Sequence, residues 1–243
     1  AIGVASLDAN TTGANNVAVG GGALGANTTA DNNTAVGKDA LTANTTGTNN
    51  VAVGSLAGDA ITTASNNVAI GAHALTTDTL GSGSIAIGRQ ALQTQNFTSA
   101  TTSYNVAVGD QAGLSVTTGI NNTLIGGLAG DAFNTSNYNT VVGYGALSSD
   151  TKGERSTAVG QEALASQNFT SQTTTGNTAL GFQAGRLITT GANNTLVGAE
   201  TGDQITTGAN NTAVGTSALG ANTTGDATTA VGKDSMKTNT TGR

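Results

Sequence analysis

The chain has 243 residues, with 36 glycines, no proline, cysteine or tryptophan, 9% charged residues and a formal net charge of -6. Without cysteine there is no disulfide framework and no cysteine-rich metal site. The eight lysines and arginines are scattered, so no basic patch is expected to bind nucleic-acid phosphates. No apolar run approaches the roughly 18 residues of a membrane helix, so we expect no membrane insertion in this segment.

Glycine recurs along the chain at a fixed interval. Eleven of thirteen intervals are 17 residues and two are 21, between these marker glycines: Gly3, Gly20, Gly37, Gly54, Gly71, Gly88, Gly109, Gly126, Gly143, Gly160, Gly181, Gly198, Gly215 and Gly232. A period of this length indicates one supersecondary unit stacked on copies of itself. We therefore expect a single repeat domain over residues 1–243, a segment of a longer fibre, with 21-residue coils at 88–108 and 160–180.

A short strand is predicted before each marker glycine. The residue before the glycine is aliphatic in every copy, the residue three before is β-branched, and alanine usually lies between them, as in Val51-Ala52-Val53. This alternation is typical of a strand with two different faces. We expect the branched side chains, such as Val36, Val53 and Ile70, to lie inside, and the flat alanine face to lie outside, where another chain could approach closely.

Asparagine stands four residues before ten of the marker glycines, as at Asn33 and Asn50. Asparagine tolerates a left-handed backbone, and stacked asparagines can pair as ladders along a column. The marker glycine itself is expected to adopt a bend that a Cβ atom would obstruct.

One core position appears in the second half of the coil, and it can be filled in two ways. Nine coils have Leu or Met four residues after the glycine, namely Leu7, Leu24, Leu41, Leu75, Leu92, Leu147, Leu164, Leu219 and Met236. The other five have glycine there and a large apolar residue three positions later, namely Ile61, Val116, Phe133, Ile188 and Ile205. This compensation predicts a shared interior.

Thr-Thr follows in most coils, as at Thr45-Thr46, and we interpret it as a second short strand with its turn. Coils of two strands and two bends would stack in parallel at about 4.8 Å per layer. The sequence therefore predicts an all-β protein, a parallel β-solenoid (β-roll) of about 14 coils with 17-residue repeats.

The two long coils carry near-identical extra segments, Gln95–Ser99 and Gln167–Ser171, spaced 72 residues apart. All seven aromatic residues lie between positions 97 and 182. We consider Phe97, Phe169, Tyr104 and Tyr144 as candidate surface contacts, for example for stacking on a sugar. The favoured interpretation of Phe97 and Phe169 is that they anchor the two inserts.

Residues with catalytic or metal-binding chemistry are sparse. His73 is the only histidine, so neither a Ser–His or Cys–His pair nor a zinc site is expected. The densest acidic group, at Asp150, Glu154 and Glu162, falls in expected loops, and Asp59, Asp131 and Asp203 are too far apart for a calcium cage and are interpreted as turn caps. We predict no catalytic, cofactor-binding or metal-ligating residue, and no enzyme.

The strand motif resembles a known family. Asn33-Thr34-Ala35-Val36-Gly37 and Asn67-Val68-Ala69-Ile70-Gly71 are similar to the Asn-Ser-Val-Ala-Ile-Gly signature of YadA-like head repeats of trimeric autotransporter adhesins, and to related bacteriophage tail-fibre repeats. The resemblance covers all fourteen coils, although the adhesin repeats are shorter, near fourteen residues. It implies a left-handed, trimeric β-roll on a bacterial surface or virion that is used for attachment.

The expected function is that of an extracellular structural and adhesive fibre segment. It would be a stiff spacer whose loops contact a surface glycan or a protein receptor. Self-association is also expected because each coil supplies only about three sizeable apolar side chains to offset the entropy of ordering 17 residues. Two alternatives stay open, an ice-binding solenoid, for which the Thr-Thr pairs would supply one outward threonine per coil, and a glycan-degrading fibre enzyme.

Overall fold

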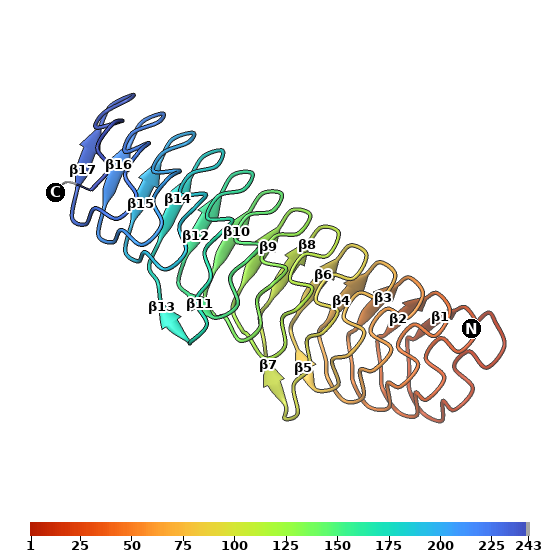
Figure 1. The fold of residues 1–243 in the computed structure, drawn as a ribbon. Helices are drawn as coiled ribbons and strands as arrows, with labels where there is room; N and C mark the ends of the chain where they lie inside the picture. The colour runs from red at the N-terminus through yellow and green to blue at the C-terminus, as the bar shows by residue number, and fades with distance from the viewer. Residues whose placement is uncertain (242–243) are drawn as a thin grey trace. The chain divides into compact units, whose positions relative to one another are not determined.

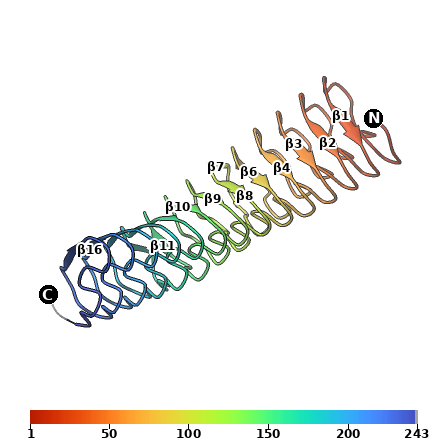
Figure 2. The same cartoon turned by 90° about the horizontal axis from the view of Figure 1, so that it is seen from above.

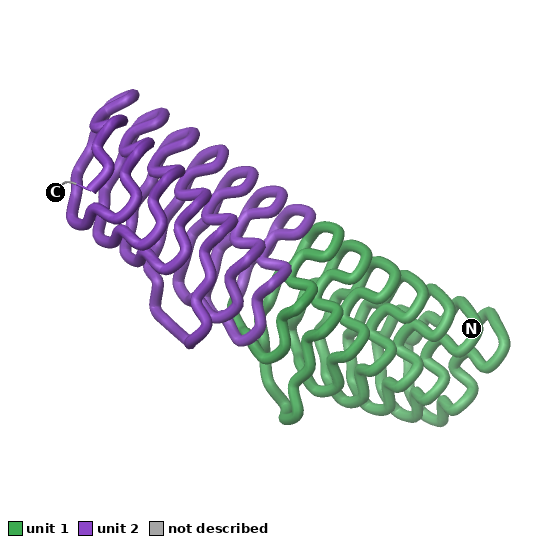
Figure 3. The backbone as a smooth tube through the Cα atoms, in the orientation of Figure 1, with its two compact units in different colours: residues 1–121 green, residues 122–243 purple. Residues whose placement is uncertain are grey.

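The computed structural model describes residues 1–241, which contain strands, turns and bends but no helix. The chain divides into two compact units, residues 1–121 and residues 122–243 (Figure 3). Each unit is a parallel β-solenoid with one coil per repeat. The predicted fold class is therefore confirmed, with thirteen three-residue strands within the described residues.

In the first unit, six three-residue strands pair in parallel, each with the next coil (Figure 1). These strands are β1 (Val17–Val19), β2 (Thr34–Val36), β3 (Val51–Val53), β4 (Val68–Ile70), β6 (Ile85–Ile87) and β8 (Val106–Val108). Equivalent residues face each other, so that Ala35 pairs with Ala52. The register continues from β6 to β8 across the 21-residue coil, because Ile85 pairs with Val106.

The second unit repeats this arrangement with seven strands, again in parallel and in register. They are β9 (Thr123–Ile125), β10 (Thr140–Val142), β12 (Thr157–Val159), β14 (Thr178–Leu180), β15 (Thr195–Val197), β16 (Thr212–Val214) and β17 (Thr229–Val231). Within each unit the strands follow one another as successive rungs, in the view of Figure 1 and in the view from above (Figure 2).

The faces of the strands are the reverse of the prediction. The central residue of every strand is buried, and the alanines among them are at most 1% exposed. Val53 and Ile70, which we expected inside, are 37% and 36% exposed, and Val36 is half-buried. The alanine face therefore packs inward, and the branched side chains form the outer face of the sheet.

The interior is narrow, which explains this reversal. Where leucine replaces the central alanine, glycine lies opposite. A Cβ atom on Gly130 would lie 2.9 Å from Cδ2 of Leu124, and one on Gly185 would lie 2.7 Å from Cδ1 of Leu196. The coil accommodates one large side chain at this level, so two branched residues per strand would overfill it.

The shared core position is confirmed. The leucines four residues after the marker glycine, from Leu24 on, and the large residues of the glycine-containing coils are fully buried, including Leu41, Ile61 and Phe133, whereas Leu7 is half-buried and Met236 is 39% exposed. The space above Gly58 is occupied by Ile61, whose Cδ1 would lie 3.0 Å from a Cβ atom on the glycine. Two sequence positions therefore fill the same interior volume.

The buried asparagines stack in a column, but their amides bond mainly to backbone groups rather than to one another as the predicted ladder requires. Asn50 Nδ2 donates to the carbonyl oxygen of Ala64 at 2.9 Å, and Asn50 Oδ1 accepts from the backbone N–H of Asn67 at 3.0 Å. The left-handed backbone, however, belongs to the preceding residue, such as Asn49 with φ of 59°. The inner asparagine satisfies buried backbone groups, and its neighbour makes the turn.

The marker glycines adopt a backbone that only glycine accommodates. Gly37 has φ of 143°, and a Cβ atom there would collide with the carbonyl oxygen of Gly54 in the next coil. This confirms the predicted bend and adds a second reason for it, which is the close approach of successive coils.

The predicted second strand is absent from the ordinary coils. Thr45 and Thr46 form a bend that is fixed by one short bond, from Thr45 N–H to the carbonyl oxygen of Thr62 at 2.9 Å. Within residues 1–241, additional strands occur only beside the inserts, where β5 (Gly81–Ser82) pairs with β7 (Thr101–Thr102) and β11 (Gly153–Glu154) pairs with β13 (Thr173–Thr174). The N–H groups of Thr45 and Thr46 both donate to the carbonyl oxygen of Thr62, at 2.9 and 3.4 Å, so the alternating ladder of a strand does not form at this bend.

Candidate functional site

The outer face of the three-residue strands is a continuous surface feature of each unit, which we call the aliphatic strip. In the first unit it consists of Val17, Val19, Thr34, Val36, Val51, Val53, Val68, Ile70, Ile85, Ile87, Val106 and Val108, all partly or well exposed. Val17 is 48% exposed and Ile85 is 36% exposed. Eleven of its twelve residues are aliphatic, and contiguous exposed apolar surface of this kind marks an interaction site.

In the second unit the strip has a different composition. Every three-residue strand there begins with threonine, so the outer face has one column of threonine and one of aliphatic residues. The threonines are Thr123, Thr140, Thr157, Thr178, Thr195, Thr212 and Thr229, and successive members pair directly across the sheet. The strip is therefore aliphatic in unit 1 and half hydroxylated in unit 2.

In most Thr-Thr bends one threonine faces outward, as the sequence predicted, although both are exposed in Thr11-Thr12 and Thr189-Thr190. Thr45 is half-buried, and its hydroxyl donates to the carbonyl oxygen of Thr62 at 3.2 Å. Thr46 is exposed. The hydroxyl of the first threonine therefore forms a hydrogen bond to the backbone, and the second threonine faces the solvent.

The aromatic candidates divide into buried and exposed pairs. Phe97 and Phe169 are only 5% and 8% exposed, so they are not surface contacts, and their burial agrees with the favoured interpretation that they anchor the inserts. Tyr104 and Tyr144 are 64% and 58% exposed and stay candidates for contact with a partner. A further exposed tyrosine, Tyr138, lies beneath the guanidinium of Arg155, 5.5 Å from the ring centre.

A buried polar network anchors the insert of the first unit. Asp78 Oδ1 accepts from the backbone N–H groups of Gly81 and Phe97, at 2.9 and 3.3 Å, and Asp78 Oδ2 accepts from Nε2 of Gln95 at 2.6 Å. Gln95 Nε2 also donates to Ser84 Oγ at 2.8 Å, and Gln95 Oε1 accepts from Asn105 Nδ2 at 2.8 Å. Burial raises the pKa of Asp78, against the lowering effect of these hydrogen bonds.

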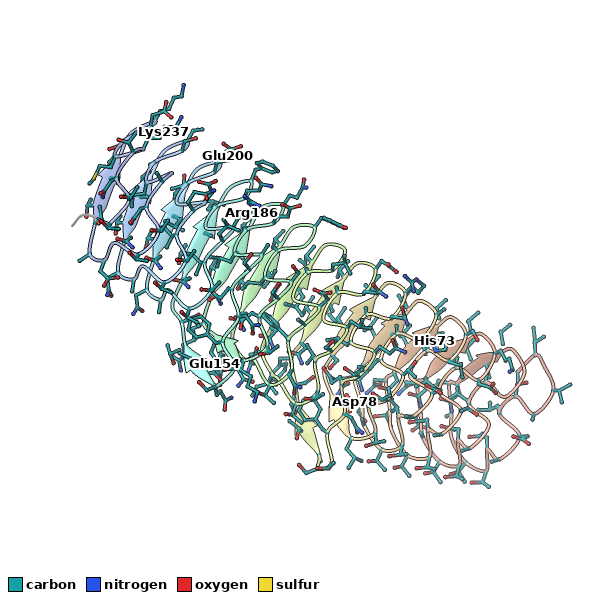
Figure 4. The ribbon with its side chains drawn as sticks, viewed as in Figure 1. His73, Asp78, Glu154, Arg186, Glu200 and Lys237 are labelled. Atoms are coloured by element: carbon teal, nitrogen blue, oxygen red, sulfur yellow. The ribbon has the colours of Figure 1, made fainter. Side chains whose placement is uncertain are left out.

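The second unit contains the same network. Asp150 accepts from the backbone N–H groups of Gly153 and Phe169, at 3.0 and 3.1 Å, and from Nε2 of Gln167 at 2.6 Å. Burial also raises the pKa of Asp150. Asp78 and Asp150 are completely buried, and Figure 4 labels Asp78 beside β5.

The acidic group proposed from the sequence does not form a common site. Asp150 lies inside the coil rather than in a solvated loop. Glu154 accepts from Asn137 and Gln172, each at 2.8 Å, and Glu162 accepts from Gln183 at 2.7 Å. The three carboxylates therefore serve separate hydrogen bonds.

The remaining candidates also lie apart from one another. Asp59 and Asp131 are half-buried; burial raises the pKa of each, and the backbone N–H groups of their own turns lower it. Residues 1–241 contain no group of three or more His, Cys, Asp or Glu side chains that could hold a metal, and no pocket. His73 is half-buried in a turn (Figure 4).

The sequence contained signals for the features that we missed. The enlarged central residues Leu124 and Leu196 occur beside glycine-containing coils, which marks the central column as interior. Asp78 and Asp150 occupy the column that holds the buried Asn27 and Asn44 in other coils. Their position in that column indicates burial.

No helix within the described residues is long and apolar enough to cross a membrane. Comparison of the chain with known proteins found no matching family model, no similar curated protein and no similar solved structure. The functional assignment therefore depends on the surfaces described above.

Proposed function

We propose that this chain is a structural and adhesive fibre segment whose copies associate through the aliphatic strip. The observation that carries the proposal is the outward orientation of two in-register columns of branched residues, of which Val53, Ile70 and Ile85 are each more than a third exposed. A folded chain with such a surface gains free energy by covering it, at roughly 25 cal/mol per Å² of apolar surface.

A second copy of the chain is the partner that fits the strip best. The strip repeats once per coil, and its register continues through the 21-residue coil between β6 and β8. A partner with the same coil spacing can repeat each favourable contact along the whole strip, whereas an unrelated surface matches it at few points. We propose a homotrimer, as the resemblance of the strand motif to trimeric adhesin heads implies.

Attachment is proposed to involve residues that self-association leaves uncovered. Tyr104 and Tyr144 are well exposed and lie outside the strip. A tyrosine ring can stack on a sugar or insert into a protein partner while its hydroxyl forms a hydrogen bond. An extracellular location, on a bacterial surface or a virion, belongs to the same proposal.

Sedimentation analysis of the purified chain tests the proposal. We expect a trimer, and we expect the double variant Val53→Lys/Ile70→Lys to sediment as a monomer because two charges would be buried in the interface. The matched control is Thr46→Lys/Thr63→Lys, which adds the same charges to exposed positions of neighbouring coils and should remain a trimer. A wild-type chain that is monomeric at high concentration, or a strip variant that still forms trimers, contradicts self-association through the strip.

The threonine column of the second unit favours ice binding as a second candidate. Thr140, Thr157 and Thr178 present side chains in register, with one aliphatic residue beside each. Such an array of hydroxyl and methyl groups could order water at regular spacing. A measurement of thermal hysteresis, the difference between the melting and freezing temperatures of ice, tests this candidate. Hysteresis that disappears in Thr157→Lys/Thr178→Lys supports ice binding, and the absence of hysteresis in the wild type removes it.

A further inference from the structure

Two exposed aromatic residues of the second unit lie in one column, directly after marker glycines. Tyr144 follows Gly143 and is 58% exposed, and Phe182 follows Gly181 and is 43% exposed. Gln161, which has the same position in the coil between them, is also exposed. No other coil of the chain has an aromatic residue at this position. We call Tyr144, Gln161 and Phe182 the ring column.

Backbone hydrogen bonds between coils fix the spacing of the ring column. The carbonyl oxygen of Tyr144 accepts from the N–H of Glu162 in the next coil at 3.0 Å. The carbonyl oxygen of Gln161 accepts from the N–H of Gln183 at 2.9 Å. The adjoining strands β10, β12 and β14 are also in register. Tyr144 and Phe182 therefore lie two layers apart, which is about 9.6 Å at about 4.8 Å per layer.

The ring column is open at both ends and has apolar and polar groups in alternation. Gly127 and Ala199 occupy the same position in the coils before and after it, so no large side chain borders the rings along the axis of the unit. An aromatic ring packs against the C–H face of a pyranose through apolar contact. The amide of Gln161, between the rings, can donate to and accept from sugar hydroxyls.

The two-layer spacing matches the repeat of one kind of polysaccharide. In an extended chain of β-1,4-linked pyranoses, each sugar advances the chain by about the height of one layer. Each sugar is also turned over relative to its neighbours, so the same face recurs at every second sugar. Rings two layers apart therefore meet equivalent faces of the chain. An α-1,4-linked chain coils and does not present its faces in this way.

The charges beside the ring column disfavour an anionic chain. The two positions after each marker glycine from Gly126 to Gly215 include Glu162 and Glu200 but no lysine or arginine. Glu162 Oε2 accepts from Gln183 Nε2 at 2.7 Å, and the N–H of Glu200, which Figure 4 labels, donates to the carbonyl oxygen of Phe182 at 2.8 Å. Carboxylates held at this edge repel acidic sugars, so an uncharged chain fits better.

We propose that the ring column binds an extended, uncharged polysaccharide of β-1,4-linked pyranoses. The chain lies parallel to the axis of the second unit, with two sugars stacked on Tyr144 and Phe182 and a hydroxyl bonded to Gln161. This inference deepens the attachment role of the proposed function and rests on it. It does not rest on self-association, because all three residues belong to one chain and lie outside the aliphatic strip.

An NMR titration of the full chain with cellohexaose, a β-1,4-linked glucose hexamer, tests the ring column. We expect Tyr144→Ala and Phe182→Ala each to weaken binding by roughly 2- to 10-fold. Tyr144→Phe keeps the ring and should bind as the wild type does, and Tyr104→Ala, at an exposed tyrosine of the first unit, should change nothing. Absence of cellohexaose binding, or binding that survives unchanged in Tyr144→Ala/Phe182→Ala, overturns the proposal.

Two further ligands test the chemical class. Maltohexaose has the same sugars in α-1,4 linkage, and a β-1,4-linked hexamer of glucuronate has the same linkage with a charge on every sugar. Both should bind more weakly than cellohexaose. If either binds more tightly and loses that binding in Tyr144→Ala/Phe182→Ala, the ligand class is overturned while the attachment role stands.

A shifted ring tests the spacing. Phe182→Ala/Ala199→Phe keeps two rings but places them three layers apart, where a β-1,4-linked chain presents opposite faces. We expect this variant to bind cellohexaose no better than Phe182→Ala does, and wild-type affinity would contradict the match of spacing. Val53→Lys/Ile70→Lys should bind cellohexaose as the wild type does, whatever its oligomeric state, and loss of binding there would contradict a site formed by one chain.

Discussion

A Cβ atom on Gly58 would lie 3.0 Å from Cδ1 of Ile61, so the glycine is small because the isoleucine three residues later fills its space. The same isoleucine interrupts the column that contains Asn27 and Asn44, and it leaves Asn44 Oδ1 buried without a hydrogen-bond partner. Gly58 and Ile61 together thus determine how the interior of this coil is packed and which buried polar atom has no hydrogen-bond partner.

A coil with glycine and isoleucine at positions 58 and 61 should tolerate conversion to the leucine-and-asparagine kind only when both residues are changed together. We expect Ile61→Asn alone to cost about 3 kcal/mol through the cavity that it leaves, and Gly58→Leu alone to cost about 1–3 kcal/mol through overpacking. The double variant should regain most of this loss, because Leu fills the interior and the new asparagine can donate to Asn44 Oδ1. A double-mutant cycle in denaturant measures the coupling, and additive losses would show that the two positions do not share one volume.

The marker glycines should resist even the smallest substitution. Gly37→Ala places a methyl group against the backbone of Gly54 and imposes a strained φ, so we expect a loss of about 4 kcal/mol or more. The control is Gly21→Ala, because a Cβ atom there would meet nothing closer than 3.8 Å, and its effect should stay within about 0.5 kcal/mol. Thermal unfolding of the two variants compares them directly, and equal melting temperatures would contradict the close contact between coils.

The inner and outer asparagines should differ sharply in importance. Asn50→Ala leaves the carbonyl oxygen of Ala64 and the N–H of Asn67 buried without their side-chain partner, at a cost of about 1–3 kcal/mol for each unsatisfied group. Asn49→Gly keeps the left-handed turn and changes only exposed contacts, so its free energy of unfolding should be nearly that of the wild type. Chemical denaturation tests this pair, and similar losses for both would argue against a stabilising role of the buried asparagine column.

Stability should decrease as pH rises from acidic values. Burial raises the pKa of Asp59 and Asp131 above the ordinary value of 3.8, with His73 and Asp39 also acting on Asp59. Between the ordinary and the raised pKa the folded state holds protons that the unfolded chain has lost, so the free energy of unfolding falls as pH increases through that interval. Asp59→Asn/Asp131→Asn should reduce this slope, and a variant with the wild-type slope in a pH series of denaturant titrations would exclude these two groups as its source.

The sequence predicted the repeat, the strand position and the shared core position, because each depends on spacing alone. It did not predict which face of the strand lies inside, because alternation separates two faces without saying which one is buried. Large residues usually lie inside, but this coil is too narrow for two branched side chains per strand. The leucines at 124 and 196, which face Gly130 and Gly185, contained the information that would have decided it.

The functional surfaces were harder to predict for the same reason. The aliphatic strip becomes a candidate interface only once Val53 and Ile70 are known to face outward. In the sequence, Asp78 and Asp150 resemble ordinary polar loop residues. The structure shows that a backbone N–H of each insert, from Phe97 or Phe169, donates to the carboxylate. Contacts between the insert and the body of the coil depend on the path of the loop, which spacing does not specify.

The strands bond only to the coils directly before and after them, seventeen or twenty-one residues away. Removing one whole 17-residue coil would therefore bring together two neighbours that already match. The four extra residues of a long coil lie outside the columns, because the strands on either side of them stay in register, whereas removing residues from a strand would shift its columns. A protein built this way can be shortened or extended in whole steps without redesigning its interior, and the damage from a point substitution stays within its own coil and the adjacent two.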